Sequence, residues 1–144
     1  MKGQSRFLKT EAGISYFARV WVEAEVAGTG VQVENALPEI TEAGSGEVNR
    51  NSAQDWVDAA LDGMRAAGEF ARGSNGSNGG HRLKLTRLVG TDVDTRADVV
   101  RCAAALAAWQ ALGVAANAPE PQFDGREWTL AFPAPTHTAA EVSP

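Results

Sequence analysis

The sequence predicts an α+β fold, a two-layer α/β sandwich in the order β-β-β-α-β-α with an extra strand near the C-terminus. Residues 14–26 alternate between apolar and polar along a run rich in aromatic and β-branched residues, as a strand with one buried face does. Residues 52–72 and 96–112 carry apolar residues at helical spacing instead. Between them, residues 81–90 return to strand alternation.

Length and composition are those of an ordinary globular protein. A chain of 144 residues suits one domain, which we place at residues 1–134. Residues 135–144 are rich in Pro, Thr and Ala and are expected to be a disordered tail. The net charge of −5 gives no long-range attraction for phosphate backbones.

The sequence also indicates the compartment and the classes of site to expect. Cys102 is the only cysteine, which excludes an internal disulfide and a multi-cysteine zinc site. No apolar run approaches the roughly 20 residues that span a bilayer, and the start of the chain lacks the apolar stretch of a signal peptide. We therefore expect a cytoplasmic protein with no membrane contact and no cofactor.

The first half of the chain predicts three strands. Residues 5–11 form a short strand candidate, and residues 14–26 form the strongest one. Glycines at the turn of residues 28–30 predict a hairpin between this long strand and residues 31–37. The alternation assigns two faces to residues 14–26: the core face takes Tyr16, Ala18, Val20 and Val22, and the opposite face takes Phe17, Arg19, Trp21 and Glu23.

The second half begins with a polar loop over residues 39–51. Ser52 and Asp55 then make an S-x-x-D pattern, which predicts a capped helix start and a helix reaching about Arg72. The segment GSNGSNGG at residues 73–80 indicates a flexible linker. In the strand that follows, the inward positions are Leu83 and Leu85, with Val89 as a further candidate.

Three aspartates crowd the segment VGTDVDTRADVV at residues 89–100. Thr95 and Asp98 repeat the capping pattern before the second helix, and Asp92 and Asp94 add negative charge near the same helix start. Capping is the favoured interpretation, a partner-facing edge is the second, and a metal site is a distant third because the spacing is not that of an EF-hand loop.

Six segments in order resemble domain IV of elongation factor G, over about residues 5–113. They are RFLKTEAG, SYFARVWVEAEV, VQVENALP, WVDAALDGMRAA, HRLKLTRLVGTDVDT and DVVRCAAALAAWQAL. The sequence DVDT at residues 92–95 stands where that family has DVDS. The resemblance implies the fold of the second domain of ribosomal protein S5, with a left-handed βαβ crossover, although crossovers are normally right-handed.

The chain departs from that family at the tip that would enter the ribosomal decoding site. The first tip loop has shrunk to the segment between Glu11 and Gly13, and the second leads directly to Asp92 and Asp94. A carboxylate-lined tip repels phosphates. The chain also has no P-loop for GTP. Translocation is therefore not expected.

Other candidate sites have simpler structural interpretations. His81 and His137 lack neighbours that would complete a triad or a zinc site, and Cys102 falls on the buried face of a helix. An exposed face suited to a partner is predicted instead, with cations that Arg65 or Arg72 could join. Its residues would be Phe17, Arg19, Trp21, Arg82, Lys84 and Arg87.

Three classes of function remain open. We favour a non-catalytic binding module whose partner is an unknown protein or a second copy of the chain. The alternatives are a translation-associated protein with weak RNA or ribosome contact, or a homo-oligomeric structural protein. An enzyme on the same superfold is supported by fold analogy alone and ranks last.

Overall fold

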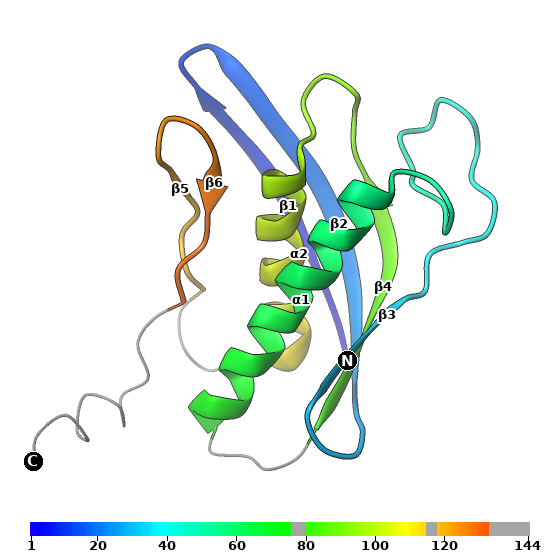
Figure 1. Ribbon diagram of the computed structural model, residues 1–144, viewed down its shortest axis with the longest axis vertical. Helices are drawn as coiled ribbons and strands as arrows, with labels where there is room; N and C mark the ends of the chain where they lie inside the picture. Colours follow the sequence, from blue (N-terminus) through cyan, green and yellow to red (C-terminus); the bar gives the residue numbers. More distant parts are fainter. Residues whose placement is uncertain (76–79, 115–117, 133–144) are drawn as a thin grey trace, which may run out of the picture.

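The computed structural model describes residues 1–75, 80–114 and 118–132. A mixed four-stranded sheet forms one layer and two helices form the other, which confirms the predicted α+β sandwich (Figure 1). The sheet order is β1-β2-β4-β3, and a small second sheet pairs β5 with β6. The elements are β1 Lys2–Glu11, β2 Ile14–Val26, β3 Val31–Asn35, α1 Gln54–Asn75, β4 His81–Val89, α2 Ala97–Leu112, β5 Gln122–Phe123 and β6 Trp128–Thr129.

β1 and β2 form a long antiparallel hairpin. Their register runs without a shift from Lys2 opposite Glu23 to Glu11 opposite Ile14. The connecting residues Ala12 and Gly13 have φ values of 50° and 80°, as a two-residue turn that follows strand twist requires. This pairing begins at Lys2, so β1 starts three residues earlier than the sequence predicts and the sheet edge is longer.

The predicted hairpin between β2 and β3 is wrong, because β4 lies between these two strands. β4 pairs antiparallel with β2 and parallel with β3. The turn at residues 28–30 forms backbone hydrogen bonds with the start of β4. Gly28 O accepts one from Gly80 N at 2.9 Å, and Gly30 O accepts one from His81 N at 2.9 Å. A local turn signal cannot reveal a strand that arrives about fifty residues later in the chain.

The β3-α1-β4 connection has the rare left-handed sense. Figure 1 looks onto the helices, which lie in front of the sheet. β3 and β4 both run upward in this view, and β4 lies to the left of β3. A connection that passes in front of the sheet and re-enters it on the left is left-handed.

The core lies between the sheet and the helices. α2 packs over β1 and β2, and α1 packs over β3 and β4. The helices approach so closely that a Cβ at Gly63 would lie 2.2 Å from the carbonyl oxygen of Arg101. A β-bulge at Trp21/Val22 changes which residues of β4 face the helices. As a result Leu88 is fully buried, whereas the sequence indicated Val89 as the inward residue.

Both predicted capping boxes are wrong. α1 begins at Gln54, and Ser52 Oγ accepts a hydrogen bond from Asn49 N at 3.0 Å in the preceding turn. α2 begins at Ala97, and its N-cap residue Arg96 makes no side-chain capping bond. At the other end of α2, Gly113 is the C-cap residue, with a left-handed φ of 64°.

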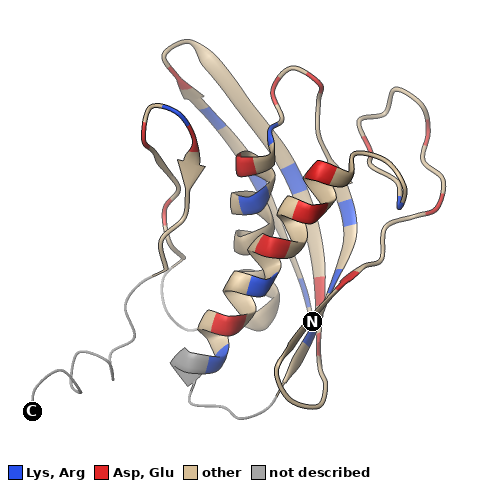
Figure 2. Cartoon of the chain, in the orientation of Figure 1, with Lys and Arg blue, Asp and Glu red and all other residues tan. Residues whose placement is uncertain are grey.

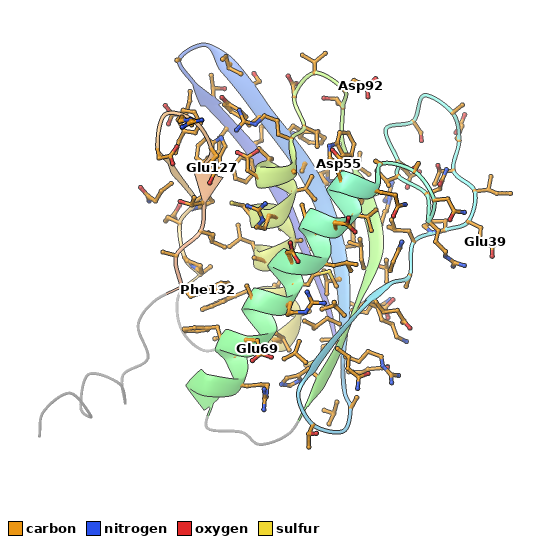
Figure 3. All side chains as sticks on the ribbon, viewed as in Figure 1. Glu39, Asp55, Glu69, Asp92, Glu127 and Phe132 are labelled. Carbon is orange, nitrogen blue, oxygen red and sulfur yellow. The ribbon has the colours of Figure 1, made fainter. Side chains whose placement is uncertain are left out.

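The C-terminal hairpin packs beside α2 on the helix side of the sheet. The ring of Trp128 lies 5.0 Å from that of Phe7 and 5.6 Å from that of Tyr16, both on the core face. Phe132, labelled in Figure 3, stacks on Phe70 at 5.2 Å and on Trp109 at 5.5 Å. Strands β5 and β6 pair with each other, so the extra strand predicted near the C-terminus does not join the edge of the main sheet and does not cover Phe17 and Trp21.

Some predictions concern residues that the structure does not describe. The linker prediction for residues 73–80 is partly wrong, because α1 continues to Asn75 instead of ending near Arg72, while residues 76–79 lie outside the described residues. His137 and the predicted tail also lie outside them. Among the described residues, no helix is both long enough and apolar enough to cross a membrane.

Candidate functional site: the helix-free face of the sheet

One face of the four-stranded sheet is left without a covering layer by the described residues. Both helices and the C-terminal hairpin pack on the other side (Figure 1). We call the uncovered side the outer face. From β1, β2 and β4 it presents the side chains of Arg6, Leu8, Phe17, Arg19, Trp21, Arg82, Lys84 and Arg87.

Trp21 is the centre of this face. The guanidinium carbon of Arg19 lies 4.7 Å from its ring centroid, and that of Arg87 lies 4.4 Å away. These are cation–π distances. Strand pairing produces the arrangement, because Trp21 lies opposite Arg87 at the bulge. Glu47 accepts a 2.6 Å hydrogen bond from Arg87 Nε and thereby fixes that guanidinium beside the ring.

Next to Trp21, two arginines face each other across adjacent strands. Arg6 on β1 lies directly opposite Arg19 on β2, a like-charge arrangement that is unfavourable in a sheet. Within the part of the chain that the structure describes, neither forms an ion pair. The next pair along the hairpin is apolar: Leu8, 54% exposed, lies opposite the half-buried Phe17.

The two cations at the opposite end of the outer face share one carboxylate. Glu25 accepts from Arg82 at 3.2 Å and contacts Lys84 at 3.6 Å. The suggestion that Arg65 or Arg72 joins these cations is wrong, because both belong to α1, on the other side of the sheet. They pair within that helix, each with an acidic residue three positions earlier at 3.5 Å. Among the described residues of the outer face, the cations that form no ion pair are therefore Arg6, Arg19 and Lys2.

The two predicted tip loops lie together at one end of the molecule. The β1–β2 turn and the turn after β4 both project from the upper end of the sheet in Figure 1, and Figure 2 shows acidic residues in each. Phe17 N donates a 2.9 Å hydrogen bond to Asp94 O, which joins them. Asp92 is exposed at the outermost part of its turn (Figure 3). Glu11 is also exposed, and Gly13 completes the tight β1–β2 turn.

Thr95 and Asp98, predicted as caps, hold separate parts of the structure together. Thr95 Oγ1 accepts from Thr91 N at 2.8 Å and donates to Phe17 O at 2.6 Å. The Asp98 carboxylate accepts from Arg96 at 2.8 and 2.9 Å and from Trp128 N at 2.7 Å. The first fixes the acidic turn against β2, and the second fixes the C-terminal hairpin against α2.

Cys102 and His81 were also considered as candidate site residues, and their surroundings differ. The Cys102 thiol is buried, as predicted, and burial raises its pKa to about 11, with the nearby Asp98 carboxylate contributing. His81 is half-buried at the start of β4, and its Nδ1 is buried without a hydrogen-bond partner. In residues 1–75, 80–114 and 118–132, no three His, Cys, Asp or Glu side chains are grouped as a metal ion would require.

Sequence reasoning missed Arg6, Leu8 and Glu47. Alternation in β1 carries a signal for the first two, because Phe7 is buried and its neighbours therefore point outward. Glu47 lies in a loop, and its place beside Arg87 depends on the bridge between Glu47 and Val89. Only the folded chain brings those residues together.

Comparison with models of known protein families gives no match, and comparison with curated protein sequences gives none. Among solved structures, 59 chains match. One is the crystal structure of ttk003000868 from Thermus thermophilus, with a TM-score of 0.59 and 17% sequence identity. The match covers 78% of this chain and 15% of that one. At this identity the likeness concerns the fold alone, and this fold corresponds to a small part of that larger protein.

Proposed function

We propose that this chain is a non-catalytic interaction module that binds a partner protein through the outer face. The observation that carries the proposal is the row of Arg19, Trp21 and Arg87 on a sheet face that no described element covers. Tryptophan and arginine are the residue types most enriched where binding energy concentrates in protein interfaces. The ring of Trp21 contacts two guanidinium groups before any partner arrives, which limits the entropy lost on binding.

The charges of the outer face indicate the chemistry of the partner. Arg6 and Arg19 repel each other across the hairpin and lack carboxylates among the described residues. A partner that places Asp or Glu side chains between them would relieve this repulsion. Leu8 and Phe17 lie beside the two arginines and offer apolar area for the same contact. The proposed partner surface is therefore acidic, with apolar residues at its centre.

The resemblance to domain IV of elongation factor G is compatible with this proposal, since that domain acts by contact and not by chemistry. It also suggests a second candidate, a protein that touches the ribosome. The unpaired cations near Arg19 favour an anionic surface of either kind. The acidic turns carrying Glu11, Asp92 and Asp94, together with the net charge of −5, weigh against RNA.

Site-specific photo-crosslinking in cells tests the proposal. A photoreactive phenylalanine analogue replaces Phe17 on the outer face, and the matched control places it at Asp62, an exposed position on α1. We expect one discrete protein adduct from position 17 and none of that mass from position 62. The adduct should disappear when Arg6→Glu and Arg19→Glu are combined. Equal adducts at both positions, or an adduct indifferent to the arginines, would contradict the proposal.

A further inference from the structure

β1 is an open edge strand whose outward hydrogen-bonding groups follow from its pairing with β2. Met1 and Ala24 exchange two backbone hydrogen bonds, at 2.9 and 2.7 Å. In an antiparallel pair such exchanging positions alternate with positions whose groups point away. The register is unbroken, so alternate residues from Lys2 to Thr10 direct their N–H and C=O groups outward.

Part of this edge is already covered, and the rest is open. Gln4 N donates a 2.7 Å hydrogen bond to Oε1 of Gln110 on α2. The amides of Arg6, Leu8 and Thr10 have no partner among the described residues. β5 and β6 pair with each other and not with this edge. An edge of this length is ordinarily shielded by proline, a bulge, a covering segment or charged side chains. The stretch from Arg6 to Thr10 has no proline and no bulge, and its charged side chains are Arg6 on the outer face and Lys9 on the opposite face. Charge alone therefore guards its open backbone groups.

The other edge of the sheet is shorter and is covered in part. β3 has only five residues. Beyond it, the loop before α1 continues along β4: Val48 N donates to Leu88 O at 2.9 Å, Gly90 N donates to Gly46 O at 2.9 Å, and Glu47 bridges to Val89. β3 therefore leaves a shorter run of open hydrogen-bonding groups than β1, and β1 is the longer open edge of the sheet.

We propose that β1 pairs antiparallel with β1 of a second copy of this chain, with Leu8 opposite Leu8 of that copy. In this register the three open residues of one chain face the three open residues of the other. Arg6 lies opposite the copy's Thr10, Leu8 opposite its Leu8 and Thr10 opposite its Arg6. All three positions are of the outward-pointing kind, so each facing pair exchanges two backbone hydrogen bonds. Two four-stranded sheets become one continuous sheet.

Side-chain chemistry selects this register over its neighbours. Leu8 lies opposite Phe17 within each hairpin, so the pairing aligns Phe17, Leu8 and their two counterparts as one apolar row across the outer face. The 54% exposed Leu8 is covered by an identical residue. Placing Arg6 opposite itself would add a second like-charge pair. Placing Arg6 opposite Leu8 would require Gln4 to release Gln110.

This inference does not depend on the proposed partner of the outer face, because pairing at the edge leaves Arg19, Trp21 and Phe17 available to that partner and uses only Leu8 from its proposed contact area. A second copy is favoured over another protein strand because the sequence of the edge is self-complementary. A dimer would present two outer faces side by side.

Sedimentation over a concentration series provides the first test. We expect a dimer for the unmodified chain, and a monomer for Leu8→Lys and for Leu8→Pro. Lysine sets two like charges opposite each other, and proline removes an outward N–H that β2 does not use. Ile40→Lys is the matched control: Ile40 is 86% exposed in the loop before α1, far along the chain from β1, and the dimer should persist. A monomer at every concentration, or a dimer insensitive to Leu8→Lys, would overturn the inference.

Crosslinking tests the register in chains that keep the native Leu8 side chain. Facing residues of this kind have Cα atoms about 5.5 Å apart, within disulfide range. Arg6→Cys mixed with Thr10→Cys should form a disulfide dimer on mild oxidation, while either variant alone should not. Cys102 is buried and does not interfere. Dimers from Arg6→Cys alone would show a different register, and none from the mixture would refute edge pairing.

Discussion

At the scale of single residues, buried polar side chains in this protein connect segments that are distant in sequence. Thr95, 6% exposed, bridges the turn after β4 and the start of β2. Asp98, also 6% exposed, bridges α2 and the C-terminal hairpin. Sequence patterns suggested helix capping for both, because a Thr three residues before an Asp is typical of a cap. Besides a near neighbour, each has a partner far along the chain, 78 and 30 positions away, and a local pattern cannot indicate such contacts.

Thr95→Ala should lower the free energy of unfolding by about 1–3 kcal/mol, because it leaves Thr91 N and Phe17 O without their partner. Thr95→Ser keeps the hydroxyl and should recover most of this loss. Thr29→Ala, at an exposed turn position, is the control and should change stability little. Denaturant unfolding measures all three. Equal behaviour of the Ala and Ser variants would show that the hydroxyl is unimportant.

The buried thiol predicts a specific dependence of stability on pH. The pKa of Cys102 is raised from 9.0 to about 11 in the folded chain, so the folded state holds this proton more tightly than the unfolded state. The resulting stability is fully present below pH 9 and is lost as the pH rises towards 11. Cys102→Ala should remove this part of the pH dependence, on the order of 2 kcal/mol at the upper limit.

Denaturant unfolding of the unmodified chain and of Cys102→Ala, from neutral pH to about pH 11, measures this effect. The titration of Lys and Tyr side chains is common to both, so it cancels in the difference between their free energies of unfolding. The folded thiol should also resist alkylation at pH 8, since only the thiolate reacts. Rapid alkylation without unfolding would contradict the raised pKa of Cys102.

At the scale of elements, close backbone approach decides where glycine is required. Gly63 in α1 lies so near α2 that a Cβ would be 2.2 Å from Arg101 O, a backbone atom that cannot turn aside. Gly63→Ala should therefore destabilise the fold by roughly 1–3 kcal/mol, although alanine is the better helix former. Ala66→Gly, at an exposed position of the same helix, isolates helix propensity and should cost about 1 kcal/mol. Thermal unfolding that ranks Gly63→Ala as neutral or stabilising would refute the close crossing.

The C-terminal hairpin should loosen as a unit when its link to α2 is cut. Asp98→Ala removes the acceptor of Trp128 N and the partner of Arg96, leaving a buried N–H unsatisfied. Amide hydrogen exchange in residues 122–132 should then accelerate, while exchange in β2 and β4 changes little. Glu127→Gln alters an exposed acid of the same hairpin and should leave exchange unchanged. Uniform acceleration across the sheet would mean that Asp98 supports the whole core.

Element type could be predicted from the sequence more reliably than element pairing. The bounds of β2 and the start of β4 follow from alternation, because each strand buries one side on the helices. The insertion of β4 between β2 and β3 could not be predicted, because the turn at residues 28–30 has the composition of a hairpin turn. For the outer face, Phe17, Arg19 and Trp21 were predicted from the same alternation. Alternation alone would place Arg87 on the side of Leu83 and Leu85, and the β-bulge at Trp21/Val22 brings it opposite Trp21 instead. The neutralisation of Arg82 and Lys84 by Glu25 depends on cross-strand register, which alternation does not specify.

At the scale of the whole molecule, charges of both signs are spread over both layers. Figure 2 shows that acidic residues predominate along α1 and in the turns at the upper end, and that basic residues predominate on the strands. Among the described residues of the outer face, Arg6 and Arg19 form no ion pair, while Arg82 and Lys84 share Glu25. A molecule with a net charge of −5 and so few unpaired cations on one face has a small electrostatic term for binding nucleic acid.

We therefore predict no strong binding to RNA or ribosomes at physiological salt. Two or three phosphate contacts near Arg6, Arg19 and Arg87 would support at most weak association, which should weaken steeply as salt rises because each contact releases a counterion. Co-sedimentation with ribosomes at about 0.15 M salt, where charges are screened beyond about 8 Å, makes the measurement. Arg82→Glu with Lys84→Glu, and Arg6→Glu with Arg19→Glu, separate the neutralised pair from the free pair. We expect the chain to stay in the supernatant, with or without the substitutions. Co-sedimentation of the unmodified chain with ribosomes that either pair of substitutions abolishes would restore a role in translation and overturn the preference for a protein partner.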